Sequence, residues 1–233
     1  KKAIQYYPGY SEAYYYLGNI YSELYDYATA EAYYNTAIEI SPYKTDFLYA
    51  RGNLYYDTND NNKAINDYSA VLEIDGTYIS AYLKRGYVFI DEELYDYALS
   101  DFSEILKLDP QNDAAVYSMG YLYYLLGNYE ESLKYLNTVT EENSFYAHAL
   151  NIRGNINFNS ENYYDALEDY TKATEVDPEF ALAYYHIGNI YFEVYLYEDA
   201  IEYYTKAIEL YYGYEEAYYN RGLAYYNIDM YNK

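Results

Sequence analysis

The sequence predicts an all-α solenoid built from 34-residue helix–turn–helix repeats. The phrase AYYYLGNIY at residues 13–21 returns as AYYHIGNIY at 183–191, an offset of 170 residues, which is five times 34. Glycine also recurs every 34 residues without interruption, at Gly18, Gly52, Gly86, Gly120, Gly154, Gly188 and Gly222. Apolar residues recur between these glycines with helical spacing, so the repeating unit is helical.

The first half of each repeat predicts an amphipathic helix. Between residues 11 and 24, apolar side chains follow one another at intervals of three and four positions. Because the glycines recur every 34 residues, the same helix is expected in every repeat. First helices are expected near 12–24, 46–58, 80–92, 114–126, 148–160, 182–194 and 216–228.

The second half of each repeat predicts another helix, from about Tyr27 to Ile40 in the first repeat, where Ser41 and Pro42 stop it. Sixteen residues after each of the first six glycines stands a large apolar residue: Tyr34, Tyr68, Phe102, Leu136, Tyr170 and Tyr204. Twelve residues after each stands a small one: Ala30, Ala64, Ala98, Ser132, Ala166 and Ala200. A helical glycine costs ~1 kcal/mol relative to alanine. We therefore expect Gly and the small residue to mark a close crossing of the two helices.

These offsets resemble the tetratricopeptide repeat family. With the ladder glycine as position 8, the family places an aromatic residue at position 4, tyrosine at 11, alanine at 20 and 27, an aromatic at 24 and proline at 32. Here tyrosine often replaces the family's tryptophan at position 4, and the middle repeats depart most. The resemblance covers the whole chain. It implies a right-handed superhelix, a concave groove lined by the first helices, and binding without catalysis.

In this register the chain is one solenoid, 1–233, with six complete repeats and a half repeat at each end. The complete repeats are 11–44, 45–78, 79–112, 113–146, 147–180 and 181–214, and the half repeats are 1–10 and 215–233. Solenoids normally end in polar capping elements, and neither end has one. We expect either a piece of a longer array or open ends that take part in assembly.

The composition narrows the possible partners. The formal net charge is −24, from 38 acids and 14 bases, and such a field disfavours nucleic acid and anionic membranes. The negative charge favours a neutral or basic partner, or it serves only to keep the protein surface soluble. No apolar run is long enough to span a membrane, and no signal peptide opens the sequence. Cysteine is absent, which excludes disulfides and fits either a cytoplasmic or an extracellular location.

No motif predicts catalysis, a metal or a cofactor. The histidines His148 and His186 are 38 residues apart and lack a ligand-pair spacing. Residues 57–68 place Asp57 and Asn59 as a calcium loop would, but Asn62 stands where glycine is needed. We therefore predict that the protein is not an enzyme and has no catalytic, metal or cofactor-binding residues.

The tyrosines divide by repeat position. Those at positions 4, 11, 17 and 24 are expected in the core, while positions 5, 9 and 12 point into the groove of the family. The predicted groove residues are Tyr15, Asn19, Tyr49, Asn53, Tyr56, Tyr87, Tyr117, Tyr121, Tyr124, Asn155, Tyr185, Asn189, Tyr219 and Tyr226. The turns hold further tyrosines that core packing does not require: Tyr6, Tyr7, Tyr10, Tyr43, Tyr78, Tyr146, Tyr211, Tyr212 and Tyr214. Exposed tyrosine at this density is typical of association surfaces, although it also fits a bias of composition alone.

Positions 2, 5, 9, 12 and 13 contain no lysine or arginine, so a groove that clamps acidic tails is disfavoured. They contain Glu12, Glu23, Asp46, Asp57, Asp91, Glu193 and Glu216. The asparagine amides fit a role in binding a peptide backbone and fit a structural role equally well. The arginines at position 7 are expected to pair with acids on the adjoining helix: Arg51, Arg85, Arg153 and Arg221.

The leading function is a non-enzymatic protein-binding scaffold that presents a Tyr/Asn-rich, acidic groove to a neutral or basic peptide, or to a glycan stacked on tyrosine rings. The alternative is a structural subunit that assembles head to tail with copies of itself into a filament. A third is the regulatory arm of a larger enzyme, which requires a catalytic domain outside these residues. The sequence leaves the ligand, the compartment and the oligomeric state open.

Overall fold

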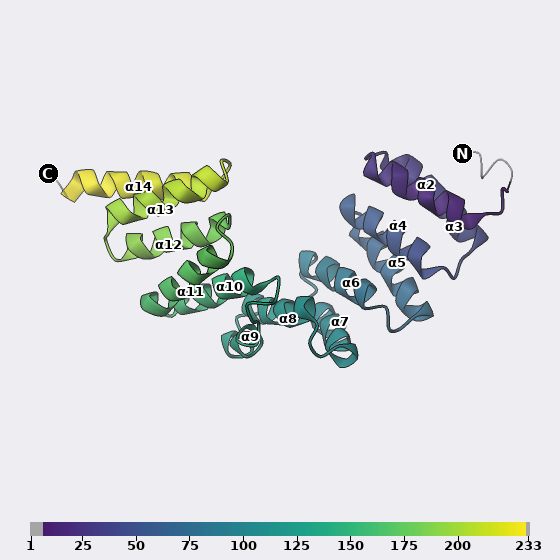
Figure 1. Cartoon of the computed structure of the whole chain (residues 1–233), viewed down its shortest axis with the longest axis horizontal. Coiled ribbons are helices and arrows are strands. Elements are labelled where there is room, and N and C mark those ends of the chain that lie inside the picture. Colours follow the sequence, from purple (N-terminus) through teal and green to yellow (C-terminus); the bar gives the residue numbers. More distant parts are fainter. Residues whose placement is uncertain (1–6, 232–233) are drawn as a thin grey trace. The chain divides into compact units, whose positions relative to one another are not determined.

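A computed structural model describes residues 7–231 (Figure 1). The predicted first half repeat, with Ala3 and Tyr6, falls mostly outside this range. Throughout the described range every regular element is an α-helix, so the predicted all-α class of tandem helix–turn–helix repeats is confirmed.

The first helices of the repeats are α2 (Ser11–Glu23), α4 (Thr45–Asp57), α6 (Ile79–Asp91), α8 (Asp113–Leu125), α10 (Tyr146–Asn159), α12 (Ala181–Glu193) and α14 (Glu215–Tyr231). The second helices are α3 (Tyr27–Ile40), α5 (Asn61–Ile74), α7 (Tyr95–Leu108), α9 (Tyr129–Leu136), α11 (Tyr163–Val176) and α13 (Tyr197–Leu210). The first helices begin within two residues of their predicted positions. Helix α9 has 8 residues where the other second helices have 14, because Asn137-Thr138-Val139-Thr140 follows it and these residues favour helix poorly.

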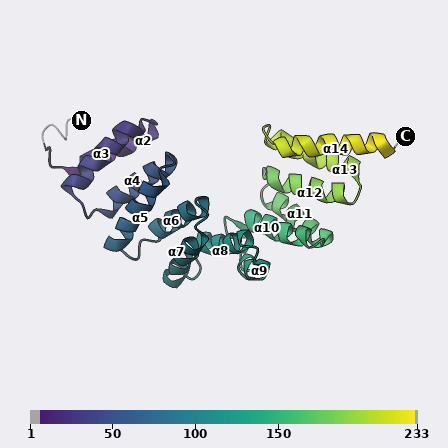
Figure 2. The ribbon, with the colours of Figure 1, turned by 180° about the vertical axis from the view of Figure 1, so that it is seen from behind.

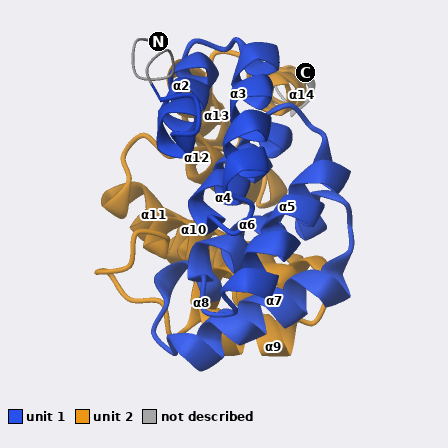
Figure 3. Ribbon diagram, turned by 90° about the vertical axis from the view of Figure 1, so that its right-hand side faces the viewer, with its two compact units in different colours: residues 1–115 blue, residues 116–233 orange. Residues whose placement is uncertain are grey.

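The chain divides into two compact units, Lys1–Ala115 and Val116–Lys233, drawn in different colours in Figure 3. In the first unit, α4 contacts α2 and α6, and α3 and α5 each also contact the first helix of the following repeat. In the second unit, α12 contacts α10 and α14 in the same way, with α11 and α13 beside them. Figure 2 shows the same pairing of helices from behind. Each unit therefore has a row of first helices backed by a row of second helices.

The first six ladder glycines make room for the large side chain at position 24, an aromatic ring in five repeats and Leu136 in one, rather than for the small residue twelve positions on. A Cβ atom on Gly154 would lie 2.5 Å from Cε1 of Tyr170, and one on Gly18 would lie 2.5 Å from Cδ1 of Tyr34. The small residue does lie close, since the Ser132 hydroxyl donates to the Gly120 carbonyl over 2.7 Å. Our attribution of the glycine to the small residue was therefore incomplete: the side chain at position 24 fills the space that a Cβ would occupy.

The turn inside each repeat has one conformation throughout the chain. Its second residue is left-handed in six repeats, with φ of 60° at Tyr25, 57° at Glu93, 72° at Gly127 and 64° at Tyr195. The next amide donates back into the first helix, as Asp26 does to the Tyr21 carbonyl at 2.9 Å. This geometry is a helix C-cap that favours glycine, yet Gly127 is the only glycine among the six left-handed residues.

Two kinds of contact join the second helices to the first helices. Arginine at position 7 binds a buried aspartate at position 23 in three repeats, pairing Arg51 with Asp67, Arg85 with Asp101 and Arg153 with Asp169. In the other three repeats an apolar residue replaces the arginine, and two tyrosines stack instead: Tyr21 on Tyr33, Tyr123 on Tyr135 and Tyr191 on Tyr203. The predicted arginine–acid pairs are thus confirmed for three of the four arginines, and Arg221 instead donates to the Thr205 hydroxyl at 2.9 Å.

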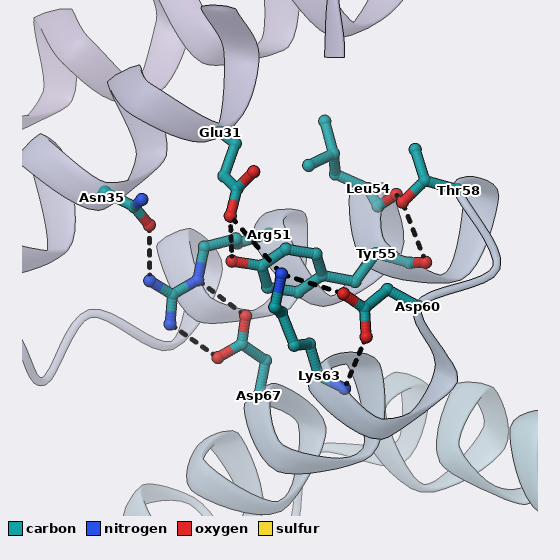
Figure 4. A network of polar contacts seen from close by, with 9 residues as sticks. All are labelled: Glu31, Asn35, Arg51, Leu54, Tyr55, Thr58, Asp60, Lys63 and Asp67. Atoms are coloured by element: carbon teal, nitrogen blue, oxygen red, sulfur yellow. Dashed lines mark hydrogen bonds and ion pairs between the residues drawn. The ribbon is translucent and has the colours of Figure 1, made fainter. Parts of the chain in front are cut away.

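Figure 4 shows one of these ion pairs and its surroundings. Arg51 donates to Asp67 through Nε at 2.8 Å and Nη2 at 2.7 Å, and its Nη1 reaches Asn35 of the preceding repeat at 2.7 Å. The nearby Tyr55 hydroxyl donates to Glu31 at 2.7 Å, and burial together with that carboxylate raises the pKa of Tyr55. Each arginine of this type therefore bonds two successive repeats together.

Candidate functional site

The predicted groove residues all lie on first helices, and most are half-buried. In the first unit they are Tyr15 and Asn19 on α2, Tyr49, Asn53 and Tyr56 on α4, and Tyr87 on α6. In the second unit they are Tyr117, Tyr121 and Tyr124 on α8, Asn155 on α10, Tyr185 and Asn189 on α12, and Tyr219 and Tyr226 on α14. Only Tyr219 and Tyr226, on the last helix, are largely exposed. We refer to this set as the first-helix face of each unit.

Each asparagine of this face receives a hydrogen bond from a buried tyrosine fifteen residues later. The Tyr34 hydroxyl donates to Asn19 Oδ1 at 2.8 Å, and the same bond joins Tyr170 to Asn155 at 2.7 Å. The other two pairs are Tyr68 to Asn53 and Tyr204 to Asn189. Burial raises the pKa of Tyr34 to about 12 and also raises the pKa values of Tyr68, Tyr170 and Tyr204, so these hydroxyls stay protonated donors at neutral pH.

This bond fixes the orientation of each amide. The oxygen is engaged by the core, so the two N–H groups of the same planar amide project away from the tyrosine. At Asn189 the oxygen accepts a second bond, from Asn220 Nδ2 at 3.1 Å. The face therefore carries oriented N–H donors in two adjacent repeats of each unit, at Asn19 and Asn53 and at Asn155 and Asn189. Asn53 and Asn155 also form side-chain hydrogen bonds with Tyr49 and Tyr124 of the same face.

In the first unit the tyrosines of this face form part of an aromatic layer. Tyr15 stacks on Phe47 of the next repeat with ring centroids 4.9 Å apart. Tyr49 lies 5.8 Å from Tyr68 and 5.3 Å from Tyr78. The rings at position 5 therefore cover the buried tyrosines and leave one edge toward solvent.

Two charged side chains, Asp91 and Lys84, contact Tyr56 on the same face. Its hydroxyl donates to Asp91 Oδ2 at 2.8 Å, and burial followed by this carboxylate raises the pKa of Tyr56 to about 12. Lys84, at position 6, places its ammonium 5.8 Å from the centre of the Tyr56 ring. The face is thus not wholly without a base, although positions 2, 5, 9, 12 and 13 contain none.

In the second unit the layer centres on Tyr117. Its ring is parallel to that of Tyr121, at 1° and 6.2 Å, and to that of Phe145, at 8° and 4.9 Å. The exposed His148 meets Tyr117 edge-on at 6.1 Å and lies 4.7 Å from Phe180. The result is a continuous aromatic surface across α8 and α10.

Helix α12 continues that surface. Tyr185 lies 4.9 Å from Tyr214 and 5.8 Å from Tyr204. His186 stacks on Tyr170 at 5.1 Å, and burial lowers the pKa of His186 to about 4. This histidine is therefore neutral at physiological pH and belongs to the core rather than to a proton-transfer site.

Sequence reasoning missed several members of this layer. Tyr78 and Tyr214 were expected to be dispensable turn residues, but their rings pack on Tyr49 and Tyr185. The signal was available, since the last position of each repeat is aromatic in four of the six repeats: Tyr78, Tyr146, Phe180 and Tyr214.

The prediction of core positions fails in α14. Tyr218 and Tyr225, at positions 4 and 11, were expected to be buried, but they are 38% and 55% exposed. Within the described part of the chain, α14 contacts α12 and α13 of the preceding repeat and has no second helix of its own repeat beside it.

In residues 7–229, no group of three or more histidine and carboxylate side chains is arranged to hold a metal ion. Of the helices in the described range, none combines the length and the apolar character that a membrane span requires.

Comparisons with known proteins agree with the repeat register. Models of the TPR repeat match residues 52–92 and 154–194, and models of the tetratricopeptide repeat match residues 1–32, 89–156 and 181–213. No curated protein matches the sequence.

Three solved structures are similar in fold. A tetratricopeptide repeat protein from Parabacteroides merdae is 24% identical with a TM-score of 0.74, over 96% of this chain and 89% of that one. PilF of Pseudomonas aeruginosa is 16% identical with a TM-score of 0.73, over 91% of this chain and 96% of that one. YrrB, described as a TPR protein with an unusual peptide-binding site, is 26% identical with a TM-score of 0.58, over 81% of this chain and 97% of that one.

Proposed function

Since the chain belongs to the tetratricopeptide repeat family, whose fold is typical of protein–protein interaction, we propose that it is a non-enzymatic scaffold. Its first-helix face binds an extended peptide segment that is neutral or basic. The peptide-binding site named for YrrB supports a peptide as the ligand class.

The observation that carries this proposal is the orientation of the asparagine amides. An extended peptide presents backbone carbonyls that need N–H donors, and Asn19, Asn53, Asn155 and Asn189 supply donors fixed by a core tyrosine. Turning the amide oxygen outward would leave the proton of a buried tyrosine hydroxyl without an acceptor, so the donors are preorganised for a carbonyl.

The charge of the first-helix face determines the charge of the peptide that binds. Asp46, Asp57 and Asp91 are exposed acids of the first unit, and the whole chain carries −24. An acidic peptide meets repulsion and a basic one attraction, and added salt weakens the attraction. The aromatic layer favours flat or cationic side chains on the ligand, and it also fits the stacked face of a sugar ring.

The proposal is tested by replacing amide donors without disturbing the core. Asn53→Asp and Asn155→Asp keep an oxygen for Tyr68 and Tyr170 but remove the N–H groups. A neutral extended peptide should bind each variant roughly tenfold more weakly, the loss of one good hydrogen bond. Asn66→Asp, an exposed position of α5, makes the same charge change on the second-helix side and serves as control.

Calorimetry with neutral, basic, acidic and oligosaccharide ligands completes the experiment. Tighter binding of the acidic peptide, or equal weakening by Asn66→Asp, contradicts the proposal. If the oligosaccharide binds most tightly, the ligand of this face is a glycan and not a peptide.

A second function is favoured by the tyrosines of the turns. Tyr43 and Tyr212 are 81% and 85% exposed, which no requirement of the core explains. A structural subunit that assembles with copies of itself would use them as contact area. Light scattering over a concentration series tests this, and a particle that stays at 27.6 kDa contradicts it.

A further inference from the structure

A cavity of about 530 Å³ opens between α10 and α11, on the second-helix side of the second unit. Its apolar lining consists of Leu150 of α10, which is 2% exposed, and Leu167 of α11. Tyr146 and Tyr164 add two aromatic rings to the walls. Among its described lining residues none belongs to the first-helix face. A ligand in this cavity does not compete for that face, so its binding is independent of the proposed function.

The two bases at this cavity already have carboxylate partners. Arg153 of α10 forms its ion pair with Asp169 of α11. The Lys172 ammonium lies 3.2 Å from a carboxylate oxygen of Glu141 and 3.5 Å from one of Glu175. Neither base that the described chain places at the cavity is therefore available as an unpaired cation for an anionic ligand.

The carboxylate of Glu168 differs from the other acids of the cavity. It lines the cavity and is exposed, and within the described side chains it has no ion pair. Glu168, Asp169 and Glu175, together with Glu141, set four carboxylates against the two bases. The excess of negative charge attracts a cation, and Glu168 is the acid that remains to pair with it.

The chemistry of the cavity fits the side chain of arginine. A guanidinium presents parallel N–H donors to a carboxylate such as that of Glu168. Its flat face stacks on a tyrosine ring, and Tyr164 offers one that is 80% exposed. Its aliphatic stem needs apolar surface, which Leu150 and Leu167 supply. A lysine ammonium is a compact, strongly hydrated charge and gains less from the ring and the carboxylate.

The following repeat has a cavity in the equivalent place, with less favourable surroundings for a cation. It measures about 470 Å³ and is lined by Tyr184 of α12 and Glu202 of α13. Its Lys206 has no ion pair within the described side chains, so an ammonium without a partner faces any cation there. Glu198 stands in α13 where α11 has Tyr164. The cavity beside α11 is therefore the better cation site of the two.

We propose that the cavity between α10 and α11 binds an arginine side chain displayed by a protein partner. Glu168 accepts the guanidinium donors and Tyr164 stacks on the guanidinium plane. Leu150 and Leu167 contact the aliphatic stem. The second-helix side of this unit is then a protein-binding surface in its own right.

The test uses the full chain and small probes with neutral ends. N-acetyl-arginine amide should cause saturable shifts of the Leu150 and Leu167 methyl resonances in nuclear magnetic resonance titrations. N-acetyl-citrulline amide has nearly the same shape without the charge, so it should bind at least about tenfold more weakly. N-acetyl-lysine amide should also bind more weakly than the arginine probe.

Three variants locate the site. Glu168→Gln removes the carboxylate at nearly constant size and should weaken arginine binding by about tenfold. Thr171→Phe, at an exposed position of the cavity wall, fills the space and should abolish the shifts while helical dichroism stays unchanged. Glu202→Gln makes the same charge change one repeat later and should leave the arginine affinity read at Leu150 unchanged.

Several results would overturn the inference. They are an arginine probe that shifts neither leucine, a citrulline or lysine probe that binds as tightly as arginine, binding that survives Thr171→Phe, and equal weakening by Glu168→Gln and Glu202→Gln. Shifts confined to the first-helix face would overturn it too, since the cation would then bind there.

Discussion

Replacing Gly154 by alanine adds one methyl group at the point where α10 crosses α11. The new Cβ would lie 2.5, 2.8 and 2.9 Å from three ring atoms of Tyr170. That ring is 1% exposed, and its hydroxyl is held by Asn155 at 2.7 Å, so it has no free space into which to move. Overpacking of this kind costs about 1–3 kcal/mol. Loss of the Tyr170–Asn155 bond adds about 1 kcal/mol, and alanine returns about 1 kcal/mol of helix propensity.

The net expectation is a loss of about 2 kcal/mol of unfolding free energy. With a urea m-value of roughly 2 kcal/mol/M, the unfolding midpoint falls by about 1 M, which far-ultraviolet dichroism resolves. Gly222→Ala is the matched control, because nothing lies within 4 Å of its Cβ position and only the helix-propensity gain of about 1 kcal/mol remains. The two substitutions should shift the midpoint in opposite directions. A Gly154→Ala protein as stable as the parent would refute the steric account of the glycine ladder.

Three further predictions concern the turns, the ion pairs and alkaline pH. Because Tyr195 has a φ of 64°, Tyr195→Gly should raise the free energy of unfolding by about 1 kcal/mol, and Gly127→Ala should lower it by about the same amount. Thermal midpoints measure both changes. Arg85→Met leaves Asp101 buried without its partner and should cost about 3–5 kcal/mol in urea unfolding, most of it recovered by adding Asp101→Leu; a single variant as stable as the parent would contradict this. The pKa of Tyr34 is raised by burial from 10.0 to about 12, so its contribution to stability is complete below pH 10 and is lost as the pH rises to about 12. Loss of helical dichroism should then accompany the part of the tyrosinate absorbance that appears as the pH approaches 12, and ionisation of every tyrosine near pH 10 in a still-folded protein would count against it.

The repeat was predictable because one period controls the whole chain. The glycines, the small residues and the large apolar residues at position 24 share one register, and α3 begins and ends at the predicted Tyr27 and Ile40. The early end of α9 also follows from local sequence, since Thr138-Val139-Thr140 disfavours helix.

The reason for the glycines was harder to predict, because it depends on which of two nearby residues lies under each glycine. Sequence spacing places both Ala166 and Tyr170 near Gly154, and only the packing of α10 against α11 shows that the tyrosine ring takes the space. Packing in three dimensions decides such cases.

The candidate site, too, was only partly predictable from the sequence. The helical register placed Asn155 and Tyr117 on the first helices. It did not reveal that the Asn155 oxygen is engaged by Tyr170, or that Phe145 and Phe180 extend the aromatic layer. These contacts join residues of different helices, and their geometry depends on how each turn ends. The exposure of Tyr218 and Tyr225 likewise depends on what packs against α14 and not on their repeat positions.

The most direct test of the scaffold account is to follow the side-chain amide resonances of Asn19, Asn53, Asn155 and Asn189 by nuclear magnetic resonance while an extended neutral or basic peptide is added. The account predicts that these N–H signals shift with the occupancy of the peptide, because each amide offers its donors to a ligand carbonyl while Tyr34, Tyr68, Tyr170 and Tyr204 hold the oxygens. Asn66, exposed on a second helix, should not move. Saturating peptide binding that leaves all four asparagine amides of the first-helix face unchanged would contradict the account.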